Sequence, residues 1–217
     1  MACGGNVSYQ SGTTSNHQSI DRVELTHNGT TWVASAISNV TTQFYSGDLA
    51  SCESMFIGSG SITQSSVIKK GYYYRIYCAV LAKNMGNYVL YSDDFGTTWT
   101  YLGSSSAAAS GDEAKVAELP DGSVLLSSRK SNGRYFNVWT WTDDKYTTGS
   151  WGSAVATNNQ TGGISYGGNS TNGDIRMIPA KKVSDGSSVV LAMQSIPTGS
   201  SRSNVSIYYK EVNAETA

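Results

Sequence analysis

The sequence predicts an all-β fold of short strands joined by tight turns, and three observations support this class. Apolar or alternating runs rich in β-branched and aromatic residues recur along the 217 residues, whereas helical periodicity is essentially missing. Turn-forming pairs such as Asn28-Gly29, Asp121-Gly122 and Asp185-Gly186 separate these runs. Charged residues make up only 14% of the chain, and 23 glycines and 14 tyrosines suit many short strands and turns. We expect strands over residues 21–26, 31–37, 72–81, 88–91, 114–119, 123–127, 135–142, 188–193 and 204–209.

One of the turns carries a specific motif. Residues 92–99 read Ser-x-Asp-x-Gly-x-Thr-Trp, which is an Asp-box, a hairpin turn found on the blades of β-propellers. The Asp94 carboxylate can accept hydrogen bonds from N–H groups of the turn, and Gly96 can adopt a positive φ without a steric penalty. Trp99 can pack its ring beneath the turn and bury a large apolar area. The motif therefore predicts a scaffold and performs no chemistry itself.

Two weaker copies of this turn suggest a repeat. One copy ends at Trp32 and has His27 in place of the aspartate, and the other begins at Asp143 and ends at Trp151. The copies are spaced at nearly the ~40–50 residues of a four-stranded propeller blade, with an insertion in the first interval. A closed propeller needs at least about four blades. We therefore expect residues 1–217 to form a single partial β-propeller domain, an incomplete ring of about three to four blades.

Charge and cysteine content narrow the possible partners. The net charge of −1 argues against a nucleic-acid surface, which needs a concentrated basic patch. No apolar run is long enough to cross a membrane, and no signal peptide is evident. Cys3, Cys52 and Cys78 cannot all pair within the chain, and their spacings do not suggest zinc. Cys52 and Cys78 either form a disulfide or remain two half-buried thiols.

The hairpin over residues 113–129 has charged residues at one end. Two strands joined by Pro120-Asp121-Gly122 are antiparallel, so Glu113 at the start and Arg129 at the finish lie beside each other. For an isolated hairpin, the plain interpretation is a solvated ion pair at the strand ends.

With the Asp-box and this hairpin in order, the chain resembles the sialidase (neuraminidase) family of six-bladed propellers, including the trypanosomal trans-sialidases. Four segments carry the resemblance in the family's order: the turn Phe56-Ile57-Gly58-Ser59-Gly60, the strand and Asp-box over residues 88–99, the hairpin over residues 113–129, and Arg202-Ser203-Asn204. Together they span roughly residues 50 to 210. The resemblance implies the central part of a sialidase catalytic domain, without its first blades and its last blade.

The resemblance implies roles for three residues. Arg129 and Arg202 match two of the three arginines that clamp the carboxylate of sialic acid, because a planar guanidinium binds a carboxylate through bidentate, charge-assisted hydrogen bonds. Glu113 matches the glutamate that takes the proton of a tyrosine nucleophile. Such a tyrosine makes sialidases exceptions to the two-carboxylate rule of glycosidases. The resemblance implies no cofactor and no catalytic metal.

The chain also departs from the family's pattern. Nothing aligns with the first clamp arginine or with the acid aspartate, which lie in the family's earliest blades. The nucleophilic tyrosine lies downstream of the third arginine, and Tyr208 and Tyr209 follow Arg202 too closely to fill that position. Lys115 stands where a small or amide residue is expected, on the same strand face as Glu113, and could pair with that carboxylate.

Other candidates have plainer interpretations. We expect Asp21 and Arg22 to form an ion pair at a turn edge and not to replace missing site residues. His17 and His27 have no acidic or cysteine neighbours at metal-ligand spacing, so we expect both at surface turns. The polar stretch over residues 167–174 is either a plain surface loop or a rim segment of a pocket.

The resulting prediction is an exo-α-sialidase that releases terminal sialic acid from sialylated glycans through a covalent tyrosyl intermediate, and that is secreted or lies at the cell surface. We expect this chain alone to be inactive. We also expect exposed blade faces to favour self-association or pairing with missing blades. Two alternatives remain: a non-catalytic propeller that binds glycans or serves in adhesion, and a structural propeller with no sugar site. The placement of Glu113, Arg129 and Arg202 distinguishes them.

Overall fold

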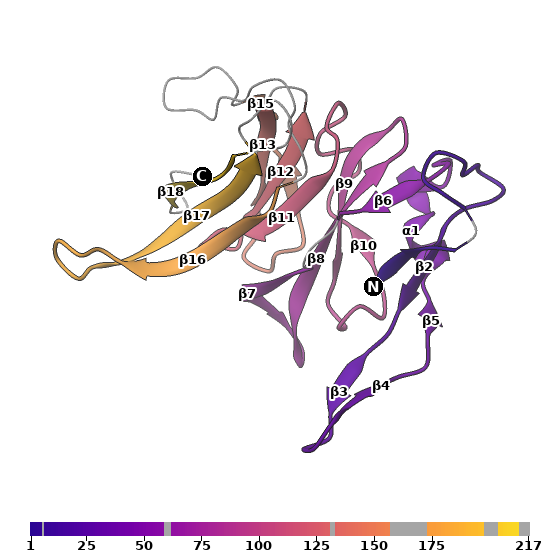
Figure 1. The fold of residues 1–217 in the computed structure, drawn as a ribbon, viewed down its shortest axis with the longest axis horizontal. Coiled ribbons are helices and arrows are strands. Elements are labelled where there is room, and N and C mark those ends of the chain that lie inside the picture. The colour runs from indigo at the N-terminus through magenta and orange to yellow at the C-terminus, as the bar shows by residue number, and fades with distance from the viewer. Residues whose placement is uncertain (6, 59–61, 131–132, 157–172, 198–203, 213–217) are drawn as a thin grey trace.

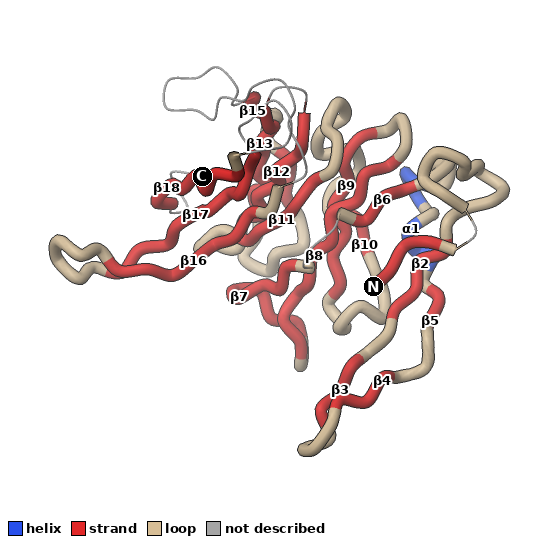
Figure 2. The backbone as a smooth tube through the Cα atoms, in the orientation of Figure 1, coloured by secondary structure: helices blue, strands red, loops and turns tan. Residues whose placement is uncertain are grey.

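The computed structural model describes residues 1–217 except 6, 59–61, 131–132, 157–172, 198–203 and 213–217. The described residues form four larger sheets and one two-stranded hairpin, and the sheets follow one another along the chain in an open arc (Figure 1). Every pairing between described strands is antiparallel. Strands dominate the trace, and a short helix lies beside the first sheet (Figure 2).

The first two sheets contain the N-terminal half of the chain. The first sheet has the order β1-β2-β5, with a separate β3–β4 hairpin extending from it, and the second has the order β10-β9-β8-β6, with β7 also pairing with β8. Their elements are β1 (Ala2–Gly4), β2 (Ser19–Arg22), β3 (Leu25–His27), β4 (Trp32–Ala34), β5 (Ser38–Asn39), α1 (Thr41–Phe44), the 3-10 helix η1 (Gly47–Leu49), β6 (Met55–Ile57), β7 (Thr63–Lys70), β8 (Tyr73–Ala82), β9 (Gly86–Ser92) and β10 (Thr100–Tyr101).

The last two sheets contain the strands of the C-terminal half of the chain. The third has the order β11-β12-β13-β14, with β15 also pairing with β13, and the fourth has the order β16-β17-β18. Their strands are β11 (Ala114–Glu118), β12 (Val124–Lys130), β13 (Gly133–Trp141), β14 (Gly149–Trp151), β15 (Val155–Ala156), β16 (Ile175–Lys181), β17 (Ser188–Pro197) and β18 (Val205–Val212).

The sheets pack face to face, and a hydrophobic core fills each of the three spaces between consecutive sheets. Because successive side chains of a strand point to opposite faces, alternate residues enter different cores. Val116 and Leu126 lie in the core between the second and third sheets, whereas Ala117 and Leu125 lie in the core between the third and fourth. The middle sheets are therefore buried on both faces, as in a stack of propeller blades. This architecture confirms the predicted all-β, incomplete propeller.

The turn over residues 92–99 has the predicted hydrogen bonds. The Asp94 carboxylate accepts from the N–H groups of Thr97 and Thr98 at 3.0 and 2.8 Å, and Gly96 has a φ of 83°. The buried Trp99 ring donates from Nε1 to the carbonyl of Gly96 at 3.1 Å. Partial burial raises the pKa of Asp94, but the hydrogen bonds from Thr98, Ser92 and Thr97 together outweigh it, so the pKa is lowered.

The two weaker copies of this turn have the same pattern, in which one side chain accepts hydrogen bonds from N–H groups of the turn, but at shifted positions. In the first copy the acceptor is Asn28, whose Oδ1 receives the N–H groups of Thr30 and Thr31 at 3.0 and 2.9 Å, so the aspartate's role falls one residue after His27. In the later copy Asp143 accepts N–H groups from residues 145, 147 and 148. The bonds from Thr148 are the main reason that the pKa of Asp143 is lowered.

Each of the nine predicted strand ranges overlaps a strand, although the range 21–26 is divided between β2 and β3. The predicted ranges left out several strands, among them β7 and β16, and β16 contains Pro179. A proline cannot donate to a strand ladder and is confined to edge strands, and β16 pairs only with β17 among the described strands. In the described part of the chain, no helix is long and apolar enough to cross a membrane.

Candidate active site

The β11–β12 hairpin brings Glu113 and Arg129 together, as the antiparallel register predicts. Their backbones are paired, since the Arg129 N–H donates to the Glu113 carbonyl at 2.9 Å. Arg129 Nη1 also donates to Glu113 Oε2 at 2.9 Å. The two side chains are 27% and 23% exposed, so the ion pair lies at the surface end of the hairpin and is only partly shielded from water. A guanidinium at this position can still be reached by an anionic ligand.

A second carboxylate, which the sequence analysis did not identify, belongs to this group. Asp112 Oδ2 lies 3.4 Å from Arg129 Nη1. Asp112 Oδ1 also accepts the N–H of Glu113 at 2.8 Å, which fixes the backbone just before β11. In the sequence, only the position of Asp112 next to Glu113 could have indicated that it belongs to this group. Arg129 is therefore held between two carboxylates.

Lys115 lies deeper on the same face of β11 but does not pair with Glu113. The residue is only 6% exposed, and no described residue is a hydrogen-bond partner of its Nζ. It lies beside Gly58, where a Cβ would come within 3.3 Å of the amine. Burial is the main cause that lowers the pKa of Lys115, against the opposing attraction of Asp174 and Glu113. Lys115 therefore does not form the ion pair with Glu113 that its position on the strand would allow, because its amine is turned into the interior.

A buried polar network lies next to this lysine, and sequence reasoning missed it. Arg134 is fully buried and donates from Nε to Ser127 Oγ at 2.7 Å and from Nη2 to the Ser127 carbonyl at 3.0 Å. Ser127 Oγ in turn donates to Gln194 Oε1 of β17 at 2.7 Å. Gln194 also donates to the Asp174 carbonyl at 2.9 Å. The network ties the third sheet to the fourth on the face that carries Glu113 and Arg129.

Several predicted residues lie outside the described residues. These include Arg202, the residues Ser59 to Ser61 of the turn after β6, and most of the stretch over residues 167–174. Of that stretch, Asp174 is described, and its Oδ2 lies 3.0 Å from Arg176 Nε. The convergence of Arg202 with Arg129 therefore stays a prediction.

The remaining candidates resolve into structural contacts. Arg22 pairs with Glu24 at 3.0 Å, while Asp21 accepts a hydrogen bond from Asn39, so the expected Asp21–Arg22 ion pair is wrong. His17 is partly buried, and its ring stacks on Tyr45 at 3.8 Å, which corrects its expected position at a surface turn. Among the described residues, no group of three or more His, Cys, Asp or Glu could hold a metal ion.

Cys52 and Cys78 are not joined to each other in a disulfide. They are 0% and 2% exposed, so they are more buried than the sequence suggested. Cys52 Sγ donates to the carbonyl of Ser54 at 2.9 Å. Neither thiol contributes a cross-link to the described fold.

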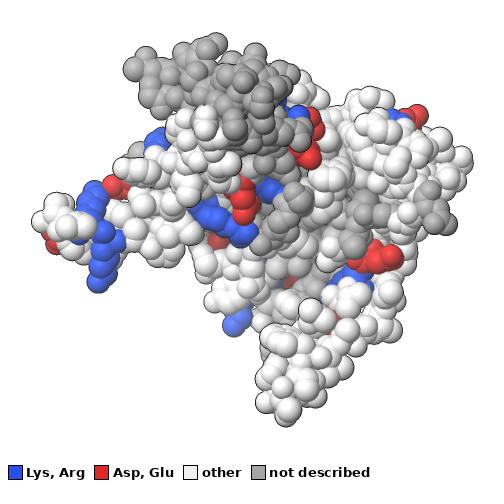
Figure 3. Space-filling model, viewed as in Figure 1, with Lys and Arg blue, Asp and Glu red and all other residues white. Residues whose placement is uncertain are grey.

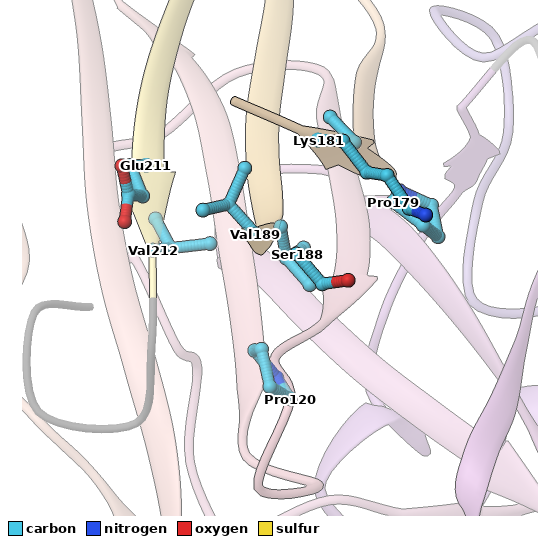
Figure 4. A pocket seen from close by; sticks show the side chains of 9 residues that line it. Pro120, Pro179, Lys181, Ser188, Val189, Glu211 and Val212 are labelled. Carbon is cyan, nitrogen blue, oxygen red and sulfur yellow. The ribbon is translucent and has the colours of Figure 1, made fainter. Parts of the chain in front are cut away.

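Two hollows lined by described residues do not include Glu113 or Arg129 in their walls. One of about 800 Å³ is lined by Pro120, Lys181, Ser188 and Glu211, among others (Figure 4). Pro120 belongs to the turn at the opposite end of the β11–β12 hairpin from Glu113. Another, of about 360 Å³, is lined by residues of β7, β11 and β16. The candidate site is therefore indicated by its side chains and not by the largest of these hollows.

No protein-family model matches this chain, and no curated protein matches it. Several solved structures, in contrast, match the chain. A leech intramolecular trans-sialidase solved with 2,7-anhydro-Neu5Ac is 23% identical with a TM-score of 0.66, and the match covers 91% of this chain and 27% of that one. The intramolecular trans-sialidase from Ruminococcus gnavus, solved with oseltamivir carboxylate, is 22% identical with a TM-score of 0.57, covering 92% and 42%. A Hadza microbial sialidase, Hz136, is 21% identical with a TM-score of 0.61, covering 89% and 34%.

These matches extend over nearly the whole described chain but over less than half of each neighbour. The chain spans between 27% and 42% of the length of these three proteins. At such low identity, the likeness concerns the arrangement of the sheets. The chain therefore has the fold of the sialidases and trans-sialidases, seen over part of their propeller.

Proposed function

We propose that this chain is part of an exo-α-sialidase, a glycosidase that releases terminal sialic acid from glycoconjugates. The observation that carries the proposal is the 2.9 Å contact between Arg129 and Glu113 on a sialidase-type sheet arrangement. In this proposal the turns over residues 92–99 and 143–151 are Asp-boxes of one partial propeller domain. The protein acts on sialylated glycans outside the cell, either secreted or at the surface.

In the proposed site, Arg129 and Arg202 bind the carboxylate of sialic acid. A guanidinium has five N–H donors in a fixed fork, which matches a carboxylate better than an ammonium does. The substrate would compete with Glu113 and Asp112 for Arg129. Displacing Glu113 from Arg129 would leave that carboxylate able to accept a proton from a tyrosine nucleophile. No residue of these 217 matches the family's acid or nucleophile, so we propose that the chain alone is inactive.

Binding of free N-acetylneuraminic acid tests the anion site without requiring turnover. We expect weak binding by isothermal titration, and at least about a tenfold loss in Arg129→Lys and in Arg202→Lys, because lysine keeps the charge but not the bidentate geometry. Arg22→Lys is the matched control, since Arg22 pairs with Glu24 far from Glu113 along the chain. Unchanged affinity in both site variants would falsify the clamp.

Turnover distinguishes the enzyme from a binding module. We expect the 217-residue chain to leave a fluorogenic sialoside intact, and release of the fluorophore that depends on Arg129 would contradict the inactivity of the chain alone. If sialic acid binds through Arg129 and Arg202, yet the parent protein offers no tyrosine that reaches Glu113, the glycan-binding alternative is correct.

A further inference from the structure

The turn of the β3–β4 hairpin carries an asparagine followed by a glycine, Asn28-Gly29, and both residues are exposed. The hairpin extends away from the first sheet (Figure 1), so water reaches the turn. In an Asn-Gly pair, the side-chain amide is open to attack by the next backbone nitrogen, because glycine has no Cβ to shield that nitrogen. Apart from the chain neighbours of Gly29, no described atom lies within 4 Å of the place that a Cβ would take. The Gly29 nitrogen is therefore unshielded.

A base lies against this nitrogen. The Gly29 N–H donates to His27 Nδ1 at 3.3 Å, so this atom of the neutral imidazole carries a lone pair and faces the proton that must leave. The His27 ring is also held in place, because it lies edge-on to the Trp32 ring with centroids 5.2 Å apart. His27 and Trp32 are paired in the β3–β4 ladder. The imidazole is therefore placed as a general base for the Gly29 nitrogen.

The side-chain carbonyl of Asn28 is polarised in the same turn. Asn28 Oδ1 accepts the N–H groups of Thr30 and Thr31 at 3.0 and 2.9 Å. The backbone is fixed as well, because the Asn28 N–H donates to the Thr31 carbonyl at 3.0 Å. Two backbone N–H groups aimed at one oxygen stabilise negative charge that develops on it, as they do in an oxyanion hole. The turn therefore places a base and a pair of oxyanion donors around one amide.

We propose that Asn28 is a site of spontaneous deamidation, and that the β3–β4 turn promotes its own reaction. The Gly29 nitrogen forms a bond to Asn28 Cγ while its proton passes to His27, and the Thr30 and Thr31 N–H groups stabilise the negative charge on Oδ1. The bond between Cγ and Nδ2 then breaks, Nδ2 takes the proton from His27, and ammonia leaves a cyclic succinimide. Water then opens the ring to aspartate or isoaspartate. This proposal does not depend on the proposed sialidase activity.

The same contacts select one of the two products. Attack of water at Cγ breaks the bond to the Gly29 nitrogen and gives aspartate with an intact backbone, whereas attack at the backbone carbonyl gives isoaspartate. Because the Thr30 and Thr31 N–H groups lie on the oxygen of Cγ, they favour attack at Cγ. Aspartate at this position would accept the two bonds as a carboxylate, as Asp94 does in the turn over residues 92–99, and charge-assisted bonds are stronger. Deamidation would therefore give the weaker copy of the turn the aspartate that its sequence lacks.

Peptide mapping by mass spectrometry, during incubation of the 217-residue chain at neutral pH, tests the proposal, because both products differ in mass from asparagine and separate from each other on a column. We expect Asn28 to deamidate at least about tenfold faster in the folded chain than in urea, since the base and the N–H groups are held only in the fold. Two other Asn-Gly pairs, Asn132-Gly133 and Asn172-Gly173, follow a serine and a threonine. In urea all three pairs should react at similar rates, which calibrates the intrinsic reactivity.

Two variants of His27 distinguish a base from a hydrogen-bond acceptor. His27→Phe keeps a flat ring beside Trp32, and His27→Gln keeps an acceptor for the Gly29 N–H, but neither side chain can take a proton at neutral pH. Both variants should slow the deamidation of Asn28 in the folded chain by about tenfold or more, at an unchanged melting temperature because His27 is exposed. In urea both should react like the wild-type chain. The share of aspartate over isoaspartate should be greater in the folded chain than in urea for all three proteins.

Three results would contradict the proposal. The first is a rate for Asn28 that is no greater in the folded chain than in urea, which would mean that the turn holds the amide away from the Gly29 nitrogen. The second is a wild-type rate in both His27 variants, which would exclude the imidazole as the base. The third is the same product ratio in the folded chain and in urea, which would overturn the role given to the Thr30 and Thr31 N–H groups.

Discussion

Lys115 is a buried amine beside Gly58, and none of the described residues gives its Nζ a hydrogen-bond partner. A buried charge that lacks a partner is unfavourable, and proteins keep one mainly where it serves a site. Its closest charged surroundings include Glu113 and Asp174, two acidic groups of the candidate site and its border. The side chain therefore reduces stability at a position where a methionine of similar length would fit.

We predict that Lys115→Met raises the free energy of unfolding by about 1–3 kcal/mol at neutral pH, since it removes a buried unsatisfied group. The pKa of Lys115 is lowered in the folded state, so between that value and roughly 10.4 the unfolded chain binds more protons than the folded one. Stability of the wild-type chain must then rise with pH across this interval, and the advantage of the variant must shrink.

Urea unfolding at a series of pH values measures this effect. The exposed Lys145→Met serves as the matched control and should change stability little at any pH. If Lys115→Met is destabilising at neutral pH, the amine has a partner that stabilises the fold.

At the scale of elements, arginines link the first sheet to a turn of the second and the second sheet to a turn of the third. Arg22 of β2 donates to the Phe95 carbonyl in the turn after β9, and Arg75 of β8 donates to the Tyr146 carbonyl in the turn after β13. Phe95 and Tyr146 both have positive φ angles, 60° and 55°. The left-handed backbone at these positions turns each carbonyl toward the arginine of the preceding sheet. The repeated turn therefore serves as an acceptor for the neighbouring blade as well as a strand connection.

Arg75 is the more buried of the two and makes the stronger set of contacts. Its Nε and Nη2 bond to both oxygens of Asp93 at 2.7 and 2.8 Å, and its guanidinium lies 4.1 Å from the centre of the Tyr91 ring. We predict that Arg75→Met lowers the free energy of unfolding by about 1–3 kcal/mol, because it removes a buried guanidinium that bonds to the partly exposed Asp93 and to the Tyr146 carbonyl.

Arg75→Lys should lose less than Arg75→Met, because it keeps the charge, but it cannot reproduce the fork. Arg22→Met is the comparison, and we expect a loss of no more than about 1 kcal/mol, because its partner Glu24 is exposed. The midpoints of denaturant unfolding check all three variants. Equal effects of Arg75→Met and Arg22→Met would show that the burial of the Arg75 guanidinium is unimportant.

Much of the local architecture could be predicted because it depends on short-range rules. The period of two and the antiparallel register were sufficient to place Glu113 beside Arg129. The sequence could not reveal that Lys115 and Arg134 are buried, because both faces of the third sheet are covered and alternation no longer separates inside from outside. Asn28 was missed because an asparagine one residue after His27 can take the aspartate's role. The position of Arg202 depends on a loop that lies outside the described residues.

For the whole molecule, the open arc leaves apolar side chains in water at both ends. Trp32 and Ile37 near the first sheet are 69% and 71% exposed, and Val205, Ile207 and Tyr209 of β18 are 72%, 62% and 73% exposed. The β3–β4 hairpin, at the lower edge of the molecule, shows almost no charge on the face seen in Figure 3. Exposed apolar surface of this kind and an unpaired strand edge favour association.

We predict that the chain self-associates in a concentration-dependent way, as measured by sedimentation velocity. Replacing Ile207 and Tyr209 together by lysine should increase the monomer fraction, because charged side chains on an edge strand oppose further pairing. A control with Ser104→Lys and Ser153→Lys adds the same charge at exposed positions elsewhere. A monodisperse wild-type monomer would contradict the prediction.

The two thiols sealed between the first and second sheets have a consequence for where this chain can work. Cys52 and Cys78 are almost inaccessible to solvent and are not joined in a disulfide, so the core around them does not depend on a bond between them. Burial raises the pKa of Cys52 and keeps that thiol in its less reactive form. The same packed arrangement can therefore persist in a reducing cytosol or in an oxidising exterior. Separation of these two sheets would expose the Cys52 and Cys78 sulfurs to either environment.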